Sequence, residues 1–260
     1  MRMLSLYCGE GLACWGYWLS GRFHEIVGVD IADMSSSYSF DFVQADALTL
    51  DYEFLMGFDF IHASPPCQGY SKMTPDQSKH PRLIHRTHVM LQAAGLPYVI
   101  ENVEGSGQEL KPNLRLYGRD FGLRMHRPRY FHLNQMRASH LSTANDAHVS
   151  TRSKINEMID GHQINVSTGD HPQMITRQLI NALPGAEMSI QGDVNLCRAV
   201  HVHGGQYVSR DELIQVFGLD CIPLKRRRLL TRDGIEQGIP PAMTKAIAEA
   251  MFPDYKAMIA

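Results

Sequence analysis

The chain has 260 residues, of which 44% are hydrophobic and 20% are charged. This is the composition of an ordinary soluble globular protein, with room for one large domain or for one domain and a smaller companion. No apolar run approaches the roughly 20 residues of a membrane span, and the N-terminus is too brief for a signal peptide before the polar residues 7–10. The five cysteines include no Cys-x-x-Cys pair, which argues against a disulfide framework and a zinc site. We therefore expect a cytoplasmic protein without a membrane partner.

The formal net charge is −2, but the charges are unevenly distributed along the chain. Residues 1–60 carry nine carboxylates and only two arginines. Basic residues gather instead between Lys111 and Arg137, and again over residues 225–228. A charge run is more often a solvated face than a binding site. Two such runs flanking one region nevertheless fit a phosphate backbone.

The N-terminal segment predicts a strand, a turn and a helix. Residues 3–7 are mostly apolar, residues 8–11 hold two glycines, and residues 12–19 continue as an apolar helix that ends near Gly21. Residues 25–30 then predict a second strand that ends in Asp30. The turn could cradle a ligand at the helix N-terminus, and Asp30 could accept the hydroxyls of a ribose. A plain connecting turn and a solvated strand-end carboxylate remain equally open.

The next elements continue the alternation of short strands with helices. Residues 42–45 predict a third strand that ends at Asp46, residues 58–63 a fourth, and residues 98–100 a fifth. Residues 81–94 predict a helix stopped by Gly95, with candidate core residues Leu83, Ile84, Val89 and Leu91. This order predicts an α/β fold with a doubly wound, mostly parallel sheet.

The chain is organised around residues 64–71, which read Ser-Pro-Pro-Cys-Gln-Gly-Tyr-Ser. The two prolines end the preceding strand, because neither can donate to a strand ladder and each fixes its own φ. Cys67 therefore stands on a stiff turn at the carboxyl end of a strand, where open α/β sheets build their active sites. A single cysteine is also commonly a small buried hydrophobe. Geometry alone leaves a reactive and an inert Cys67 equally open.

Four motifs, in this order, resemble those of the DNA cytosine-5 methyltransferase family. They are Pro-Cys-Gln at 66–68, Glu-Asn-Val at 101–103, Arg-x-Arg-x-Phe at 127–131 and the closing segment Gln-Gly-Ile-Pro-Pro at 237–241, which a helix over 242–251 follows. The resemblance covers about residues 3–131 and 228–252. Departures include Leu12 where the family has a second glycine, Ser5 where it has an acid, Met125 where it has a glutamine, and a closing segment without Asn-Ala. These shortcuts resemble the compact enzymes of bacteriophages.

The resemblance implies an S-adenosylmethionine-dependent methyltransferase fold, with S-adenosylhomocysteine as the product of the cofactor. The implied cofactor contacts are Tyr7, Cys8, Gly9, Glu10, Gly11, Leu12, Asp30, Ile31, Asp46, Ala47 and Pro65. The implied domains are a catalytic and cofactor-binding domain over 1–136, a small target-recognition lobe over 137–224, and a C-terminal segment over 225–260 that returns to the catalytic domain. We expect a monomer.

The resemblance also implies a covalent reaction on double-stranded DNA. Cys67 would add to carbon 6 of cytosine as a thiolate, with its pKa lowered by nearby cations. A protonated Glu101 would neutralise ring nitrogen 3, because burial raises its pKa. Arg127 and Arg129 would orient the ring carbonyl, steady Glu101 or hold a phosphate. The target base must be flipped out of the duplex to be reached.

Three alternatives stay open at the level of sequence. Some relatives with the same motifs modify transfer RNA, so the substrate could be RNA. The chain could also be a catalytically silent nucleic-acid-binding protein, or it could transfer a modified group instead of methyl. No metal site is predicted, since His85 with His88, and His201 with His203, lack further ligands at a matching spacing.

The family pattern fades between Phe131 and about Lys225. Residues 139–165 are polar, residues 194–202 resemble a strand, and residues 209–212 resemble a helix start with acids in the first turn. By its position this region corresponds to the variable part that selects the target sequence. We expect a small lobe with modest base contacts.

Overall fold

The structure is a computed structural model, and it describes residues 1–123, 125, 127–135, 187–189, 199–201 and 209–253. The strands are β1 (Arg2–Leu6), β2 (Glu25–Asp30), β3 (Asp41–Gln44), β4 (Phe60–Ala63), β5 (Tyr98–Asn102), β6 (Leu114–Leu116), β7 (Arg129–Leu133), β8 (Glu187–Ser189) and β9 (Ala199–His201). The helices are α1 (Leu12–Leu19), α2 (Tyr52–Met56), α3 (Ile84–Ala94), α4 (Gly107–Leu110), α7 (Arg210–Val216), α8 (Leu224–Arg227), α9 (Arg232–Gln237) and α10 (Pro241–Met251). Short 3₁₀ turns, such as η1 (Ala47–Thr49) and η3 (Glu104–Ser106), connect some of them.

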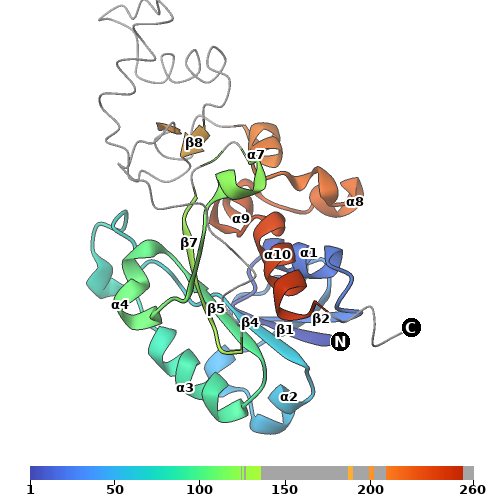
Figure 1. The fold of residues 1–260 in the computed structure, drawn as a ribbon, viewed down its shortest axis with the longest axis vertical. Helices are drawn as coiled ribbons and strands as arrows, with labels where there is room; N and C mark the ends of the chain where they lie inside the picture. Colours follow the sequence, from blue (N-terminus) through green and yellow to red (C-terminus); the bar gives the residue numbers. More distant parts are fainter. Residues whose placement is uncertain (124, 126, 136–186, 190–198, 202–208, 254–260) are drawn as a thin grey trace, which may run out of the picture.

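A seven-stranded sheet with the order β3-β2-β1-β4-β5-β7-β6 forms the centre of the molecule (Figure 1). The neighbours from β3 to β5 are parallel, whereas β7 runs antiparallel to both β5 and β6. Strand order reverses between β1 and β4, because the chain winds outward from β1 to β2 and β3 and then returns to β4 on the other side. In open α/β sheets a ligand site lies outside the carboxyl ends of the strands at such a point.

The two faces of the sheet are covered by different helices. Side chains alternate between the faces along each strand. Leu4 and Ile61 join the core under α2, α3 and α4, whereas Met3 and Phe60 join the core under α1 and α10. The doubly wound, mostly parallel α/β fold predicted from the sequence is therefore confirmed.

The C-terminal helix α10 packs tightly on α1, the helix that follows the first glycine turn. A Cβ atom at Gly16 would lie 2.0 Å from Thr244 Oγ1 and 2.1 Å from the Pro241 carbonyl oxygen, so only glycine allows this approach. Thr244 Oγ1 donates to the Ala13 carbonyl at 2.7 Å. Helix α10 therefore packs against α1, the helix that follows the turn at the carboxyl end of β1.

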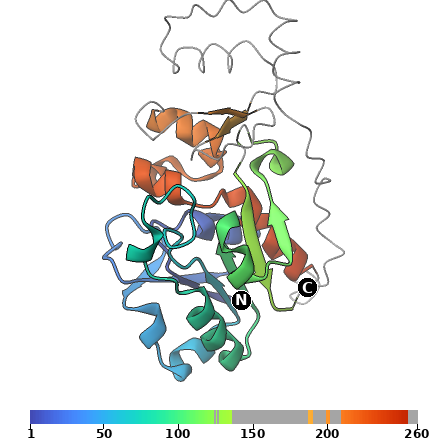
Figure 2. The same cartoon turned by 90° about the vertical axis from the view of Figure 1, so that its left-hand side faces the viewer.

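Helices α7 and α9 lie beyond one end of the sheet in both ribbon views (Figures 1 and 2). Their apolar residues form a third core with Leu12 and Trp15 of α1 and with the fully buried Met125. The predicted helix start at Ser209 is confirmed, since Ser209 and Glu212 form a reciprocal capping box. Residues 209–224, which the predicted lobe would include, thus begin with a helix whose buried side chains share a core with α1.

Most of the predicted elements are confirmed, with boundaries shifted by a few residues. The helix over 12–19 and the strand over 25–30 have the predicted bounds. The helix expected over 81–94 begins only at Ile84, and Val89 was wrong as a core residue because it is 52% exposed. The buried residues of this helix are Ile84, Thr87, Leu91 and Ala94, and this spacing leaves Val89 on the opposite side.

Two expectations about the rest of the chain are settled only in part. The strand predicted over 194–202 is present as β9, while residues 194–198 and 202 lie outside the described residues. Arg127 and Arg129, counted in the first basic run, are 3% and 7% exposed and so do not belong to a solvated face. Across the described parts of the chain, no helix is both long and apolar enough to cross a membrane.

Candidate active site

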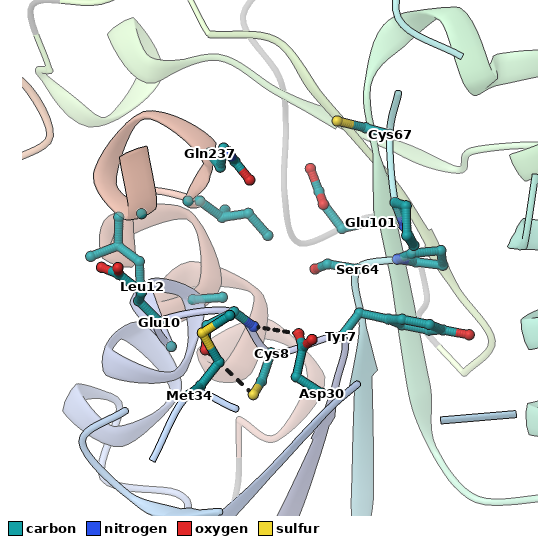
Figure 3. Close-up of a pocket in the computed structure, with 18 of the residues that line it drawn as sticks. Tyr7, Cys8, Glu10, Leu12, Asp30, Met34, Ser64, Cys67, Glu101 and Gln237 are labelled. Atoms are coloured by element: carbon teal, nitrogen blue, oxygen red, sulfur yellow. Dashed lines mark hydrogen bonds between the residues drawn. The ribbon is translucent and has the colours of Figure 1, made fainter. Parts of the chain in front are cut away.

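A cavity of about 420 Å³ lies where the strand order reverses (Figure 3). Figure 3 shows Cys67, Glu101 and Ser64 on one side and Glu10, Leu12 and Gln237 on the other. The cavity is lined by residues from the β1 turn, the end of β2, the Cys67 loop, β5, β7 and the closing segment: Tyr7 to Ala13, Asp30, Ile31, Met34, Ser64 to Gln68, Glu101, Val103, Arg129, Thr231, Asp233, Gly234, Gln237, Gly238 and Ile239. Segments that lie far apart in the sequence therefore share one cavity.

The turn after β1 presents backbone to this cavity. Tyr7, Gly9 and Gly11 all have positive φ, at 55°, 50° and 80°. A Cβ at Gly11 would lie 2.6 Å from the Tyr38 ring, whereas a Cβ at Gly9 would meet nothing within 4 Å. The Tyr7 side chain points toward α3, where its hydroxyl lies 2.9 Å from Thr87 Oγ1. Gly9 is thus the point at which a ligand can approach the backbone most closely.

Asp30 stands beside the turn at the end of β2. Its Oδ2 accepts from the Gly9 N–H and its Oδ1 from the Ala32 N–H, each at 3.0 Å. The carboxylate therefore holds the glycine turn in place. Each carboxylate oxygen can accept more than one hydrogen bond, so Asp30 keeps acceptor capacity for hydroxyl groups of a ligand.

Glu10 connects the turn to the start of α9. Its carboxylate accepts from Thr231 N at 2.7 Å and from Thr231 Oγ1 at 2.6 Å. Leu12 packs on Gly238, where a Cβ would lie 2.5 Å from Leu12 Cδ2. The side chain of Leu12 is therefore accommodated by a glycine of the closing segment. Glu10, predicted as a cofactor contact, has both oxygens bonded to Thr231.

Two predicted cofactor residues are not brought to the cavity. Asp46 is exposed and caps η1, accepting from the Leu48 N–H at 2.9 Å, and Ala47 is buried in the core under α2 and α3. The other predicted contacts, including the 71% exposed Ile31 and Pro65, do line the cavity. The roles of all these residues toward the cofactor remain predictions.

The loop that carries Cys67 is anchored by Tyr70. The Tyr70 hydroxyl donates to Glu109 Oε1 at 2.8 Å, and the Arg82 guanidinium lies 4.5 Å from the centre of the Tyr70 ring. A Cβ at Gly105 would lie 2.1 Å from the Tyr70 carbonyl oxygen, so the loop packs directly on the backbone after β5. This packing fixes the turn on which Cys67 stands.

Glu101 and Arg129 form a buried ion pair next to the thiol. Arg129 Nε lies 3.0 Å from Glu101 Oε1, and both side chains are 8% exposed. The neighbouring Asn102 donates through Nδ2 to the Pro65 carbonyl at 2.8 Å, which ties β5 to the Cys67 loop. The structure therefore brings together Cys67, Glu101 and Arg129, three of the four predicted catalytic residues, around one cavity.

The pKa values of these groups are coupled. Burial raises the pKa of Glu101 even though Arg129, Arg127 and a hydrogen bond from Ser64 lower it. Burial also raises the pKa of Cys67, and the Glu101 charge raises it further, against the lowering effect of Arg129 and Arg127. The expectation that cations lower the Cys67 pKa overall was therefore wrong, because burial and the nearby carboxylate outweigh both arginines.

Arg127, the fourth predicted catalytic residue, does not line the cavity. Its Nη2 donates to the Gly238 carbonyl at 3.0 Å and also to the Glu236 carbonyl, and its guanidinium lies 5.2 Å from the centre of the Phe217 ring. Burial lowers the pKa of Arg127 well below its ordinary value. Its contacts tie the closing segment to the strand that carries Arg129.

Sequence reasoning missed several residues of this site. Ser64 adjoins the prolines of the recognised loop, and Thr231 and Asp233 precede the recognised closing segment by a few residues. A signal existed for Ser64, since it directly follows a strand end that points at the site. Thr231 and Asp233 carried no comparable signal. Among the described residues, no group of three or more His, Cys, Asp or Glu side chains could hold a metal ion.

The lining of the cavity offers three kinds of contact to a ligand. An open backbone turn at Gly9, a carboxylate at Asp30 and an apolar lining from Leu12 and Met34 offer contacts for the tail, a ribose and a ring. The thiol and the carboxyl of Glu101 lie at the other side of the cavity (Figure 3). One part of the cavity could therefore hold S-adenosylmethionine while the other receives a reacting group.

No protein-family model and no curated protein matches the chain, but solved structures do. The Entamoeba histolytica methyltransferase EhMeth is 14% identical with a TM-score of 0.53, and the match covers 98% of each chain. The S. pombe Dnmt2 methyltransferase is 14% identical with a TM-score of 0.52, covering 97% of this chain and 98% of that one. A Spodoptera frugiperda DNMT2 mutant is 14% identical with a TM-score of 0.51, covering 96% and 99%. At this identity the likeness shows that the chain shares the fold of these methyltransferases.

Proposed function

We propose that the protein is an S-adenosylmethionine-dependent methyltransferase that modifies carbon 5 of cytosine in DNA through a covalent bond to Cys67. The observation that carries this proposal is the single cavity in which Cys67, the Glu101–Arg129 pair and the glycine turn meet. The shared fold of the solved methyltransferases supports the same reaction class.

The turn side of the cavity would hold the cofactor. The backbone at Gly9 would receive its amino-acid part, and the free acceptor capacity of Asp30 would bind its ribose hydroxyls. When bound, S-adenosylmethionine supplies an electrophilic methyl group on its sulfonium, which carbon 5 of the base takes. Leu12 and Met34, which line the cavity, would offer apolar surface to the adenine.

The thiol side would activate the base. The Cys67 thiolate forms a bond to carbon 6, the electron pair moves through the ring to nitrogen 3, and nitrogen 3 takes the proton of Glu101. Carbon 5 gains nucleophilic character and is then methylated. Nitrogen 3 returns its proton to Glu101, water removes the proton of carbon 5, the 5,6 double bond forms again, and the carbon–sulfur bond breaks to release the thiolate.

The coupled pKa values suit this sequence of steps. A protonated Glu101 removes the negative charge that raises the pKa of Cys67, so the proton donor and the thiolate favour each other. Arg129 remains beside both groups and stabilises the thiolate as it forms.

A basic surface near the cavity would receive the phosphate backbone. Lys225, Arg226 and Arg228 on and after α8 are exposed, and α8 immediately precedes the segment that contains Thr231 and Asp233 of the cavity. Arg227 differs, since it pairs with Asp220. Exposed cations beside an active site are the usual electrostatic contribution to nucleic-acid binding.

Methyl transfer to DNA and to RNA tests this function. Purified protein is incubated with labelled S-adenosylmethionine and either genomic DNA or total transfer RNA, and bisulfite sequencing then locates modified cytosines. The proposal expects label in DNA at carbon 5 of cytosine in wild type and none in Cys67→Ser. Label in transfer RNA alone would establish the RNA substrate class instead, and cofactor binding without transfer to either would support a silent binding protein.

A further inference from the structure

A row of hydrogen-bonded side chains runs from the core of the protein to Ser64, which lies beside Glu101. The Tyr17 hydroxyl lies 2.9 Å from His62 Nδ1, and His62 Nε2 lies 2.8 Å from Ser64 Oγ. Ser64 adjoins Glu101 across the β4–β5 pair, and its hydroxyl lowers the pKa of the Glu101 carboxyl. In Figure 3 the Ser64 hydroxyl and the Glu101 carboxyl both face the cavity. The row therefore connects α1, β4 and β5 to the reacting side of the site.

Strand geometry explains why these residues meet. His62 lies on the α1 face of β4 because its neighbours Ile61 and Ala63 point to the opposite face. Ser64, two residues later, lies on the same side as His62. The β4–β5 register pairs Ala63 with Ile100, so the next residues along the two parallel strands are Ser64 and Glu101. The register of the sheet therefore places Ser64 beside Glu101.

Tyr17 and His62 are buried, Ser64 is half-buried at the cavity, and none of the three carries a charge. Tyr17 is 0% and His62 1% exposed, and burial lowers the pKa of His62 to about 3. Ser5, the register partner of His62 on β1, carries no charge either. His62 is therefore a neutral imidazole, which has one N–H donor and one acceptor nitrogen.

A neutral imidazole gives the row a direction. If Tyr17 donates to Nδ1, then Nε2–H donates to Ser64 and the Ser64 hydroxyl donates to the Glu101 carboxylate. Every O–H and N–H of the row then has an acceptor. In the reverse direction the Tyr17 hydroxyl proton has no acceptor among the described residues, which is costly at a buried position. The row therefore delivers one oriented donor to Glu101.

We propose that Tyr17, His62 and Ser64 are positioning residues that hold the Glu101 carboxyl toward the cytosine ring and control when it takes up a proton. Arg129 of β7 pairs with the same carboxyl. Glu101 therefore has polar neighbours on both sides of β5, from β7 and from the end of β4. Arg127 also lowers the pKa of Glu101, and the Glu101 charge in turn raises the pKa of Cys67. The part of this inference that concerns cytosine rests on the proposed function.

The protein contains a matched tyrosine–histidine pair that does not reach the site. Tyr98 of β5 bonds His88 Nε2 of α3 at 3.1 Å, on the opposite face of the sheet from Val99. Tyr98 is 2% exposed, so Tyr98→Phe removes a buried hydroxyl from a histidine just as Tyr17→Phe does. Only Tyr17→Phe alters the row that leads to Glu101.

The test measures the pKa of Glu101 without any substrate. Protein labelled with carbon-13 at the glutamate carboxyl is titrated by NMR, and the Glu101→Gln variant assigns the signal. We expect Ser64→Ala to raise the Glu101 pKa by about one unit, because it removes a donor to the charged form. We expect Tyr17→Phe to raise it by a few tenths and Tyr98→Phe to leave it unchanged. An unchanged pKa in both Ser64→Ala and Tyr17→Phe would overturn the inference.

A second measurement separates this inference from the proposed function. In single-turnover methyl transfer at saturating DNA, we expect Ser64→Ala to lower the rate about tenfold at unchanged DNA affinity, and its basic pH limit to move upward with the Glu101 pKa. If wild type transfers no methyl group, the proposed function fails while the NMR titration still decides the row. If Ser64→Ala does not fold, the isosteric Tyr17→Phe and its Tyr98→Phe control decide alone.

Discussion

The two sides of the cavity are built by different means. On the turn side, the Asp30 carboxylate accepts hydrogen bonds from the N–H groups of Gly9 and Ala32. The Glu10 carboxylate accepts from the N–H and the hydroxyl of Thr231. On the thiol side, Arg129 pairs with Glu101 and lowers the pKa of both Glu101 and Cys67, while the Glu101 charge raises the pKa of Cys67. The first side fixes a shape, and the second side holds groups whose protonation can change.

This difference predicts different consequences for substitution. A change on the turn side should affect cofactor affinity and stability while the thiol keeps its reactivity. A change on the thiol side should affect rate and pH dependence while the cofactor still binds. The following predictions test this division, from the largest expected effect to the smallest.

The largest effect is expected for Glu101→Gln. The glutamine keeps the shape but cannot give a proton to nitrogen 3, so methyl transfer should slow by roughly a hundredfold or more. The substitution also removes the charge that raises the Cys67 pKa. The pH at which iodoacetamide half-alkylates Cys67 should therefore fall in Glu101→Gln, with cofactor affinity unchanged in calorimetry. A rise in that pH would contradict the coupling.

A smaller effect is expected for Asp30→Ala. The variant loses an acceptor for ribose hydroxyls and leaves the Gly9 N–H without its partner. Hydrogen bonds to a charged group contribute about 1.5–3 kcal/mol each, so calorimetry should show S-adenosylmethionine bound at least tenfold more weakly. Asp46→Ala is the matched control, because Asp46 caps η1 outside the cavity. An equal loss of S-adenosylmethionine affinity in the two variants would show that Asp30 does not contact the cofactor.

How far the sequence predicts the molecule is clear from these two aspartates. Asp30 ends one predicted strand and Asp46 follows another, and both strands are present, yet only Asp30 reaches the cavity. Strand ends follow from local apolar runs and turn residues, which is why β1, β2, β4 and β5 were predicted. The direction in which an end residue points depends on the following turn, and the side chain of Asp46 bends back to bond the N–H of Leu48.

Contacts between distant segments were beyond prediction for a related reason. Thr231 and Glu10 are 221 residues apart, and Arg127 meets Gly238 across 111 residues. Nothing in local periodicity pairs such residues, because the pairing arises only when α9 and α10 return to the sheet. The row from Tyr17 to Glu101 is similar, since α1 must first settle on the face that carries His62.

A modest effect is expected for Thr231→Val on the turn side. The Thr231 hydroxyl donates to Glu10 and also accepts from the Gly234 N–H at the start of α9. Losing a helix cap typically costs about 1 kcal/mol, so the free energy of unfolding in urea should fall by about that amount. Thr231→Ser keeps both bonds and should restore stability. The pH dependence of Cys67 alkylation should stay that of wild type. A shift in it would contradict the claim that the turn side does not affect the thiol.

The smallest effect is expected at the basic surface of α8. Neutralising Lys225, Arg226 or Arg228 with glutamine should weaken DNA binding to a similar degree for every sequence. Each lost phosphate contact should reduce the slope of log affinity against log salt by about 0.9. Arg227→Gln offers a comparison, since Arg227 already pairs with Asp220 and should change the slope less. Identical slopes in all four variants would place phosphate binding elsewhere.

The central claim, that Cys67 bonds to the base, is tested most directly by trapping the covalent adduct. Cytosine with fluorine at carbon 5 cannot lose a proton after methylation, so the carbon–sulfur bond should persist. Protein is mixed with S-adenosylmethionine and DNA in which 5-fluorocytosine replaces cytosine, and the adduct is mapped by mass spectrometry after heating in detergent. Cys8 lines the same cavity from the turn side and serves as the control thiol. The account predicts an adduct on Cys67 that persists in Cys8→Ser and vanishes in Cys67→Ser, whereas an adduct on Cys8, or one that survives in Cys67→Ser, would contradict it.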